Sequence, residues 1–481
     1  MQSRLRCWVW MIKAALVACS RADMSWCLST WAEDNFGGCD FGDIRRTKRI
    51  VQMANLTINN PDSSLPAQMT DWAGLRAAYR LFHCEDVTAE SVGQSHWRHS
   101  LENARGETLV LCDTTEIDFG SRRDIDGTGP TGNGSGNGFL LHNALLVDAT
   151  SKEVWGLGAQ VIHTRPTTPI KDNAARKLKR KRESQVWGKA VDMIGRAREG
   201  ANYTVVGDRG ADNFEFFVHL VENGHDWNLR AKSLNRIVLD ASGERVSLAK
   251  AMEAFPYKGS YELQVVATKQ RQQRTAHLEV FSGTVDLPLP RNKSPYVRQH
   301  APESIRTNVI VVRELNPPSN KEAMSWVIYT SHPASTFAQC YKSLETYECR
   351  WMIEEFHKAL KTGCRVESHQ LQTTESLQPL VAYLSVVAVA LLQIRSHART
   401  DPDEKASKTV PANWLKMLKA MRRKTKRVCD ITIREFYRQI AMLGGFLGRK
   451  SDGEPGWQTL WRGWHKLHMF LQGAEALKSM E

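Results

Sequence analysis

The pattern of apolar and polar residues predicts helical ends and a strand-rich middle. Before residue 100, two segments carry apolar residues at helical spacing: FGDIRRTKRIVQMA and DWAGLRAAYRLF. From about residue 106, runs rich in β-forming residues follow one another: TLVLCDTTEIDF, FLLHNALLVDA, EVWGLGAQVIHT, ANYTVVGD and DWNLRAK. A helix is expected at about 183–198, and another from Asp212 to about Glu222, with Asp212 and Glu215 as a capping pair. Strands joined to a strand–helix–strand unit predict a mixed α/β sheet.

The second half of the chain returns to strands and then to helices. Residues 235–330 contain further strand patterns and read as a β insertion within the α/β core. A long helix is predicted from about 336 to 362, and the remainder is helical apart from a polar, basic linker near 399–408. The apolar run LVAYLSVVAVALL (380–392) is shorter than the ~20 residues of a membrane span, so we expect a buried core helix there.

The glycine-rich segment GTGPTGNGSGNG (127–138) is predicted to be a flexible hairpin tip. It lacks the Gly-Lys-Ser/Thr of a phosphate loop and the glycine spacing of a dinucleotide-binding turn.

The N-terminus allows two interpretations. Arg4 and Arg6 precede an apolar stretch from Trp8 to Cys19, which faintly resembles a signal peptide. Lys13 interrupts that stretch. The other interpretation is an over-extended translation start, with Met24 as the true first residue.

The charge of the chain favours a polyanionic partner. Lys and Arg number 65 against 52 Asp and Glu, which gives a net charge of +13. Residues 176–182 (RKLKRKR) form one strongly basic run. Lys and Arg gain affinity for nucleic acids by releasing counterions from phosphates, although many basic proteins have no such partner. The ten cysteines form no CxxC pair, which argues against a zinc module and favours reduced thiols in a cytosolic protein.

The segment YECRWMIEEFHKALK (347–361) is the strongest candidate for chemistry. At about 100° per residue, one side of the helical wheel gathers Tyr347, Arg350, Glu354 and Lys361. The opposite side is apolar and should face the core: Met352, Ile353, Phe356, Ala359 and Leu360. A solvent-exposed polar side with an ordinary Arg350–Glu354 pair would explain the pattern equally. An Arg, a Lys and a Tyr around one carboxylate would also suit phosphate binding beside a metal ligand.

Two upstream aspartates could join Glu354. Asp113 and Asp208 each follow an apolar run of strand type, in LVLCDTTE and YTVVGDRGAD. A buried aspartate is costly unless it is paired or metal-bound. A turn or helix-cap role is the alternative, above all for Asp208. Three carboxylates suit a pair of Mg²⁺ ions, which prefer oxygen ligands and can activate water while stabilising a leaving oxygen in phosphodiester cleavage.

These motifs together resemble the DDE transposases of the insertion-sequence-four family, of the Tn-five type. The family's Tyr-x2-Arg-x3-Glu-x6-Lys signature is matched by Tyr347, Arg350, Glu354 and Lys361, and its two aspartates by Asp113 and Asp208. Similarity extends through GDIRRTKR, AAYRLF, SWVIYTSHP, LGGFLGRK and WQTLWRGW, so it covers nearly everything from Met24 onward. The chain departs from the family at Gly210, where an acidic residue is common.

The resemblance implies an RNase H-like catalytic core with a β insertion, flanked by N- and C-terminal helical domains. The corresponding boundaries are 1–23 for an extension outside the family pattern, 24–105 for a DNA-end-binding domain, 106–370 for the core with its insertion at about 235–330, and 371–481 for a dimerisation region.

The resemblance also implies site residues, cofactors and partners. Asp113, Asp208 and Glu354 would be the catalytic metal ligands for two Mg²⁺ ions, with Mn²⁺ as a substitute. Trp326 would stack on a base flipped out near the transposon end, although a core strand aromatic explains it too. The implied DNA contacts are Tyr347, Arg350, Lys361, Trp326, Arg230, Lys358, Arg45 and Arg46.

The expected partners are double-stranded DNA, as terminal inverted repeats and target, and a second copy of the chain in the DNA complex. The expected location is the cytoplasm, on the nucleoid, with no membrane. A related RNase H-like nuclease and a catalytically inactive DNA-end-binding relative are the rival interpretations.

Overall fold

The computed structural model describes residues 30–58, 61, 63–69, 71–166, 182–265, 273–318, 323–400, 402–421, 431–449 and 452–478. The expected N-terminal extension (1–23) and nearly all of the basic run 176–182 lie outside these residues. The chain divides into two compact units: Cys39–Ile50 with Pro61–Ser396, and Met1–Gly38 with Val51–Asn60 and His397–Glu481.

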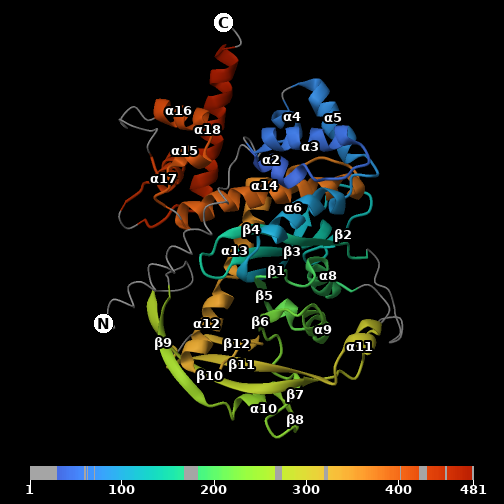
Figure 1. Cartoon of the computed structure of the whole chain (residues 1–481), viewed down its shortest axis with the longest axis vertical. Helices are drawn as coiled ribbons and strands as arrows, with labels where there is room; N and C mark the ends of the chain where they lie inside the picture. The colour runs from blue at the N-terminus through green and yellow to red at the C-terminus, as the bar shows by residue number, and fades with distance from the viewer. Residues whose placement is uncertain are drawn as a thin grey trace. The chain divides into compact units, whose positions relative to one another are not determined.

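The larger unit, Cys39–Ile50 with Pro61–Ser396, is built on a mixed sheet that has 12 strands in the described part of the chain (Figure 1). The order is β2-β3-β1-β5-β6-β12-β11-β10-β7-β8, with β4 also paired to β3 and β9 to β10. The strands of the core region are β1 (Gly106–Asp118), β2 (Gly129–Thr131), β3 (Gly136–Asp148), β4 (Val154–His163), β5 (Ala201–Gly207) and β6 (Asp226–Arg230). Those of the insertion are β7 (Ile237–Leu239), β8 (Arg245–Ser247), β9 (Tyr257–Val265), β10 (Arg274–Pro288), β11 (Ser304–Leu315) and β12 (Ser325–Thr330).

The strand directions explain why the sheet is mixed. β1, β5 and β6 run parallel, whereas the other named pairs are antiparallel. Parallel strands need a long crossover, and α9 (Phe214–Asn223) supplies the one between β5 and β6. β3 is buried along nearly its whole length, which fits a strand covered on both faces. The predicted α/β class with an RNase H-like core and a β insertion is therefore confirmed.

Helices of this unit surround the sheet. They are α4 (Leu65–Gln68), α5 (Trp72–Phe82), α6 (Ala89–Asn103), α8 (Gln185–Ile194), α9, α10 (Leu248–Met252), α11 (Pro295–His300), α12 (Phe337–Glu348) and α13 (Trp351–Lys358). Short 3-10 turns lie at Arg209–Ala211, before α9, and at Val366–Ser368, and a π turn lies at Ala359–Gly363. One large apolar cluster joins α8 and α9 to the strands, and a second lies between β9–β12 and α12.

The apolar helix α14 (Thr374–Thr400) is longer than the predicted run 380–392. Its segment Thr374–Ser396 is long and apolar enough to cross a membrane by length and composition alone. However, 89% of the apolar window is buried inside the protein. The interpretation as a core helix is therefore confirmed.

The other unit contains α2 (Trp31–Phe36), α15 (Ala406–Thr409), α16 (Ala412–Met421), α17 (Ile433–Leu443) and α18 (Trp457–Lys478). Helix α3 (Ile44–Thr57) is divided between the two units. Trp414 of α16 packs edge-on against Trp464 of α18, with ring centres 4.9 Å apart. Aromatic side chains thus hold the C-terminal helices together.

Three local predictions were wrong or incomplete. Asn213, not Asp212, caps α9 by accepting from the Glu215 amide, and Asp212 forms an ion pair with Arg236 instead. Ile44, placed on the apolar stripe of α3, is exposed. The segment 127–138 includes β2 and the start of β3, so the turn itself is shorter than predicted.

The helix predicted at 336–362 is broken in the structure. The amides of Cys349, Arg350, Met352 and Ile353 bond to carbonyls three residues earlier, which tightens the chain between α12 and α13. After α13 the Cys364 amide bonds to the Ala359 carbonyl five residues earlier, which makes a π turn. One helical wheel therefore cannot describe Tyr347, Glu354 and Lys361 together.

Candidate active site

The first two carboxylates are placed by the parallel pairing of β1 and β5. Cys112 of β1 pairs with Gly207, the last residue of β5. Asp113 and Asp208 are therefore the next residues on neighbouring strands, at the same level of the sheet. β5 ends at this level and β1 continues to Asp118, so the two aspartates lie beside the carboxyl end of β5, where α/β proteins commonly place their sites.

The third carboxylate comes from α13, which packs against β1. The apolar side of this helix is buried as predicted, with Ile353 and Phe356 fully inaccessible. Its polar side directs Arg350 and Glu354 to the sheet edge. Arg350 Nη1 lies 3.4 Å from Asp113 Oδ2, and Arg350 Nη2 lies 2.5 Å from Glu354 Oε1. One guanidinium therefore joins two carboxylates that are far apart in sequence.

The surroundings of Asp113 disfavour its ionised form. Burial and then the negative charge of Asp208 raise the pKa of Asp113 from 3.8 to about 6. Glu354 adds to this rise, whereas the Thr114 amide and Arg350 oppose it. Desolvation and like charge both disfavour an ionised carboxylate. Asp113 thus sits where an added positive charge would be strongly stabilising.

Asp208 is held by a local turn. Its Oδ1 accepts a hydrogen bond of 2.7 Å from the Gly210 amide. A Cβ at position 210 would lie 3.0 Å from that same oxygen and 3.0 Å from the Trp187 ring. The glycine that departs from the family pattern therefore fits a crowded turn, in which Trp187 occupies the space beside Asp208.

The donor set suits a hard divalent cation, because three carboxylates supply anionic oxygen. Burial, followed by the neighbouring charge of Asp208, raises the pKa of Asp113, so a bound cation would offset both effects. No group of three His, Cys, Asp or Glu side chains in the described ranges is arranged as a preformed metal site. The guanidinium of Arg350 pairs with Asp113 and Glu354 at this point.

The other members of the sequence signature each have contacts of their own. Tyr347 is in the last turn of α12, partly buried against the cluster of β9–β12 and α12. Lys361 lies in the π turn, where its Nζ is 3.2 Å from Glu367 Oε1. Lys358 pairs with Glu355 at 3.0 Å on the same helix. Both lysines are thus in ion pairs within the protein, and any phosphate contact must compete with a carboxylate.

Trp326 and Arg230 lie on adjacent strands. Trp326 is in β12 and packs, half-buried, against the same cluster as Tyr347. Arg230 ends β6, and its Nη2 donates to the carbonyl of Ser325 at 3.5 Å. Trp326 is therefore neither a fully buried core residue nor a free surface ring.

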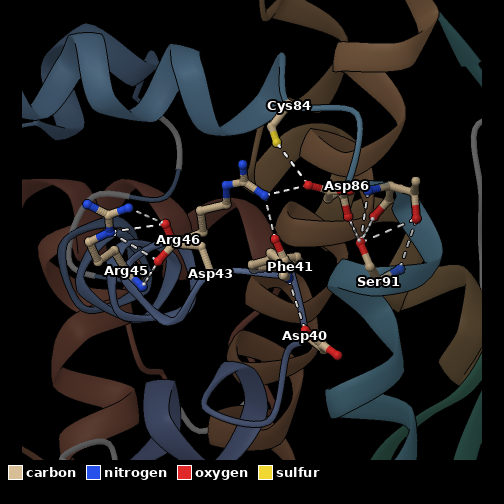
Figure 2. A network of polar contacts seen from close by, with 10 residues as sticks. Asp40, Phe41, Asp43, Arg45, Arg46, Cys84, Asp86 and Ser91 are labelled. Carbon is tan, nitrogen blue, oxygen red and sulfur yellow. Dashed lines mark hydrogen bonds and ion pairs between the residues drawn. The ribbon is translucent and has the colours of Figure 1, made fainter.

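Arg45 and Arg46 of α3 differ although they are neighbours (Figure 2). The Arg45 side chain is 87% exposed and pairs with Asp43 at 2.7 Å. Arg46 Nη1 instead bonds at 2.5 Å to both Asp86 Oδ2 and the Phe41 carbonyl. Arg46 thus ties α3 to the segment before α6, whereas Arg45 can reach solvent.

The active-site region also contains a set of buried polar residues that was not predicted from the sequence. Asn143, Gln160, His357 and Ser385 hydrogen-bond to one another. The only signal was the pair His142–Asn143, which interrupts the apolar run FLLHNALLVDA.

Segments near the two ends of the chain match known protein families. Residues 28–87 match the family described as Transposase DNA-binding. Residues 386–481 match the family described as Transposase Tn5 dimerisation domain.

Proposed function

Because the chain is a transposase of the Tn5 type, we propose that it catalyses cut-and-paste transposition with Asp113, Asp208 and Glu354 as its catalytic carboxylates. The observation that supports this proposal is that Asp113 lies one residue beyond the Cys112–Gly207 pair, level with Asp208, while Arg350 joins Asp113 to Glu354. DNA binding and dimer formation follow from the two matched domains.

The carboxylates would hold two Mg²⁺ ions, or Mn²⁺ as a substitute. Such ions, when bound, lower the pKa of water and stabilise charge on the attacking and leaving oxygens. The chain's own task is to fix the phosphodiester in line with its attacking oxygen, which contributes much of the rate in such reactions. Arg350, Tyr347 and Lys361 would position phosphates around Glu354.

The proposed reaction has four transfers at phosphorus. Water breaks the phosphodiester at the transposon end and frees a 3′-hydroxyl. That hydroxyl attacks the opposite strand and closes a hairpin, releasing the flanking DNA. Water reopens the hairpin, and the two 3′-ends attack target DNA. Each transfer exchanges one P–O bond for another, so no covalent bond to the enzyme is needed.

Glu354→Gln and Asp208→Asn should abolish nicking of an end-containing duplex and leave duplex binding within about twofold. The reason is that each substitution removes a ligand charge while it preserves shape. Glu345→Gln, on the exposed side of α12, is the matched control. Nicking and strand transfer are measured on gels with Mg²⁺, and binding by anisotropy.

The outcomes separate the rival functions. Nicking without transfer into a plasmid would indicate a nuclease of the same fold. Binding without any cleavage would indicate an inactive relative. Full activity of both variants would remove the carboxylates from the mechanism.

Trp326→Ala should separate hairpin formation from nicking. A stacked base gains about 1–3 kcal/mol from an aromatic platform, so its loss should lower the hairpin yield about tenfold or more while nicking persists. The half-buried position predicts a smaller loss of stability than the roughly 3–5 kcal/mol of a core tryptophan. A thermal melt beside a product gel checks both, and a proportional loss of every product with early melting would favour a core role.

A further inference from the structure

A row of polar side chains runs across three strands from Asp113. In the β1–β3 ladder Asp113 lies opposite Asn143, and in the β3–β4 ladder Asn143 lies opposite Gln160. Residues opposite one another in antiparallel strands present their side chains on the same face. Asp113, Asn143 and Gln160 therefore share one face of the sheet.

Two helices complete this row with hydrogen bonds. Asn143 Nδ2 donates to His357 Nε2 of α13 at 3.1 Å. Gln160 Nε2 donates to Asn143 Oδ1 at 2.7 Å and to Ser385 Oγ of α14 at 2.9 Å. Ser385 Oγ in turn donates to the Val381 carbonyl at 2.7 Å. These hydrogen bonds make the strand row continuous with α13 and α14.

The row is buried, so each of its polar groups costs folding free energy unless its hydrogen-bond partner is present. Asn143 and Ser385 are fully inaccessible, and Gln160 and His357 are at most 8% exposed. A buried polar group that loses its partner costs about 1–3 kcal/mol, whereas apolar residues of the same shape would fill the space without that risk. A linked polar set instead fixes one relative position of the elements that it joins.

By joining α13 to the sheet, the row of hydrogen bonds fixes the position of Glu354. His357 follows Glu354 by three residues, so both lie on neighbouring parts of one face of α13. Arg350 closes the other side of the loop by its contacts with Glu354 and Asp113. A ring therefore runs from Asp113 across the ladder to Asn143, to His357, along α13 to Glu354, and back through Arg350.

We propose that Asn143 and His357 are positioning residues, which hold Glu354 at the correct distance from Asp113 through the Asn143–His357 hydrogen bond. The proposal rests on the function proposed above, because it concerns the same carboxylates. Burial also lowers the pKa of His357 to about 3, so its ring is neutral and Nε2 is free to accept from Asn143. Neither residue touches the reacting atoms.

The test compares His357→Leu with His357→Gln in the full chain. Leucine removes the acceptor, whereas glutamine offers an amide oxygen near the position of Nε2. We expect His357→Leu to slow single-turnover nicking about 10–100-fold and to raise the Mn²⁺ concentration for half-saturation similarly, as is usual when a residue that orients a metal ligand is replaced. His357→Gln should recover most of both losses, and binding to the end duplex should stay within about twofold throughout.

Ser385→Ala is the matched control, since it loses a buried hydrogen bond of the same set but does not touch α13. It should nick at nearly the wild-type rate even if its melting temperature falls. Asn143→Leu should repeat the effect of His357→Leu. Mn²⁺ binding is followed by the electron paramagnetic resonance of the free ion, and stability by thermal melting.

Several results would overturn the proposal. These are nicking by folded His357→Leu within about twofold of the wild type, an equal defect in Ser385→Ala, and no recovery in His357→Gln. If the wild type bound Mn²⁺ but did not nick, the proposed function would fall, and the Mn²⁺ titrations of the variants would still decide the positioning role. Unchanged Mn²⁺ binding in His357→Leu would then refute it.

Discussion

At the scale of single residues, the most buried charge of the site is that of Asp113. The Asp113 side chain is 18% exposed and lies beside two other acidic groups, with Arg350 as an ion-pair partner. Its environment therefore opposes ionisation. A residue kept in such a state lowers the stability of the fold, which is the usual consequence of a site arranged for chemistry.

Asp113→Asn should stabilise the protein without added divalent ions. The folded pKa of about 6 exceeds the usual 3.8, so ionisation costs folding free energy as pH rises through this window. The penalty is absent below about pH 4 and complete above about pH 6. Its removal should add up to roughly 3 kcal/mol at pH 8, less the lost pairing with Arg350.

Thermal melts of both proteins at pH 4 and pH 8, in chelator, check this prediction. The difference should be large at pH 8 and small at pH 4. An Asp113→Asn protein that melts below the wild type at pH 8 would contradict it.

The sequence could identify the acidic residues but not how they are joined. Asp113, Asp208 and Glu354 stand out because carboxylates follow apolar strands or share a helix face with basic groups. The Arg350–Glu354 pair follows from helical spacing, but the contact of Arg350 with Asp113 depends on tertiary packing. The same is true of the Asn143–His357 bond, whose partners are 214 positions apart.

At the scale of elements, breaks and caps decide where side chains point. The interruption between α12 and α13 reorients Tyr347 relative to Glu354, and the π turn does the same for Lys361. The apolar pattern correctly predicted the strands and most helices, because apolar residues occupy the buried positions of these elements. It could not predict the interruption, because the amides of Cys349 and Arg350 bond to carbonyls three residues earlier within an otherwise helical pattern.

Helix α3 provides a prediction at this scale, because its two neighbouring arginines have different surroundings. Arg45→Ala should weaken binding to end DNA and reduce the slope of log affinity against log salt by about 1, while the melting temperature stays unchanged. Arg46→Ala should lower the melting temperature, because it loses Asp86 and the Phe41 carbonyl together (Figure 2). Salt titrations of anisotropy and thermal melts distinguish the two. Equal melting temperatures for both variants would show that the Arg46 contacts do not stabilise α3.

At the scale of the whole molecule, the surplus of positive charge bears on binding to DNA, and the C-terminal helices bear on binding to a second copy of the chain. Helix α18 leaves large apolar side chains in solvent: Met469, Phe470 and Leu477. Phe470 and Leu477 are seven residues apart and therefore lie on one side of the helix. The segment belongs to the part of the chain that matches a dimerisation domain.

The domain boundaries predicted at residues 24, 106 and 371 remain predictions.

Phe470→Glu should disrupt pairing of two chains on DNA ends, because a charge would be buried without a partner. The mass of the end-bound complex, measured by light scattering, should fall from two chains to one. Gln472→Glu adds the same charge at an exposed position on another side of α18 and should leave the mass unchanged. Two chains per complex in the Phe470→Glu variant would exclude this side of α18 from the interface.

The double ion pair of Arg350 has a consequence for how the protein responds to its ligands. A guanidinium bound to two carboxylates competes with any cation for the same oxygens, and it cannot serve a phosphate at the same time. By thermodynamic linkage, a DNA phosphate that draws Arg350 away must raise the affinity of the carboxylates for divalent ions. Divalent ions must raise the affinity for DNA by the same factor. An enzyme built this way would stay idle in ion-rich solution and assemble its cutting centre only where a DNA end is already bound.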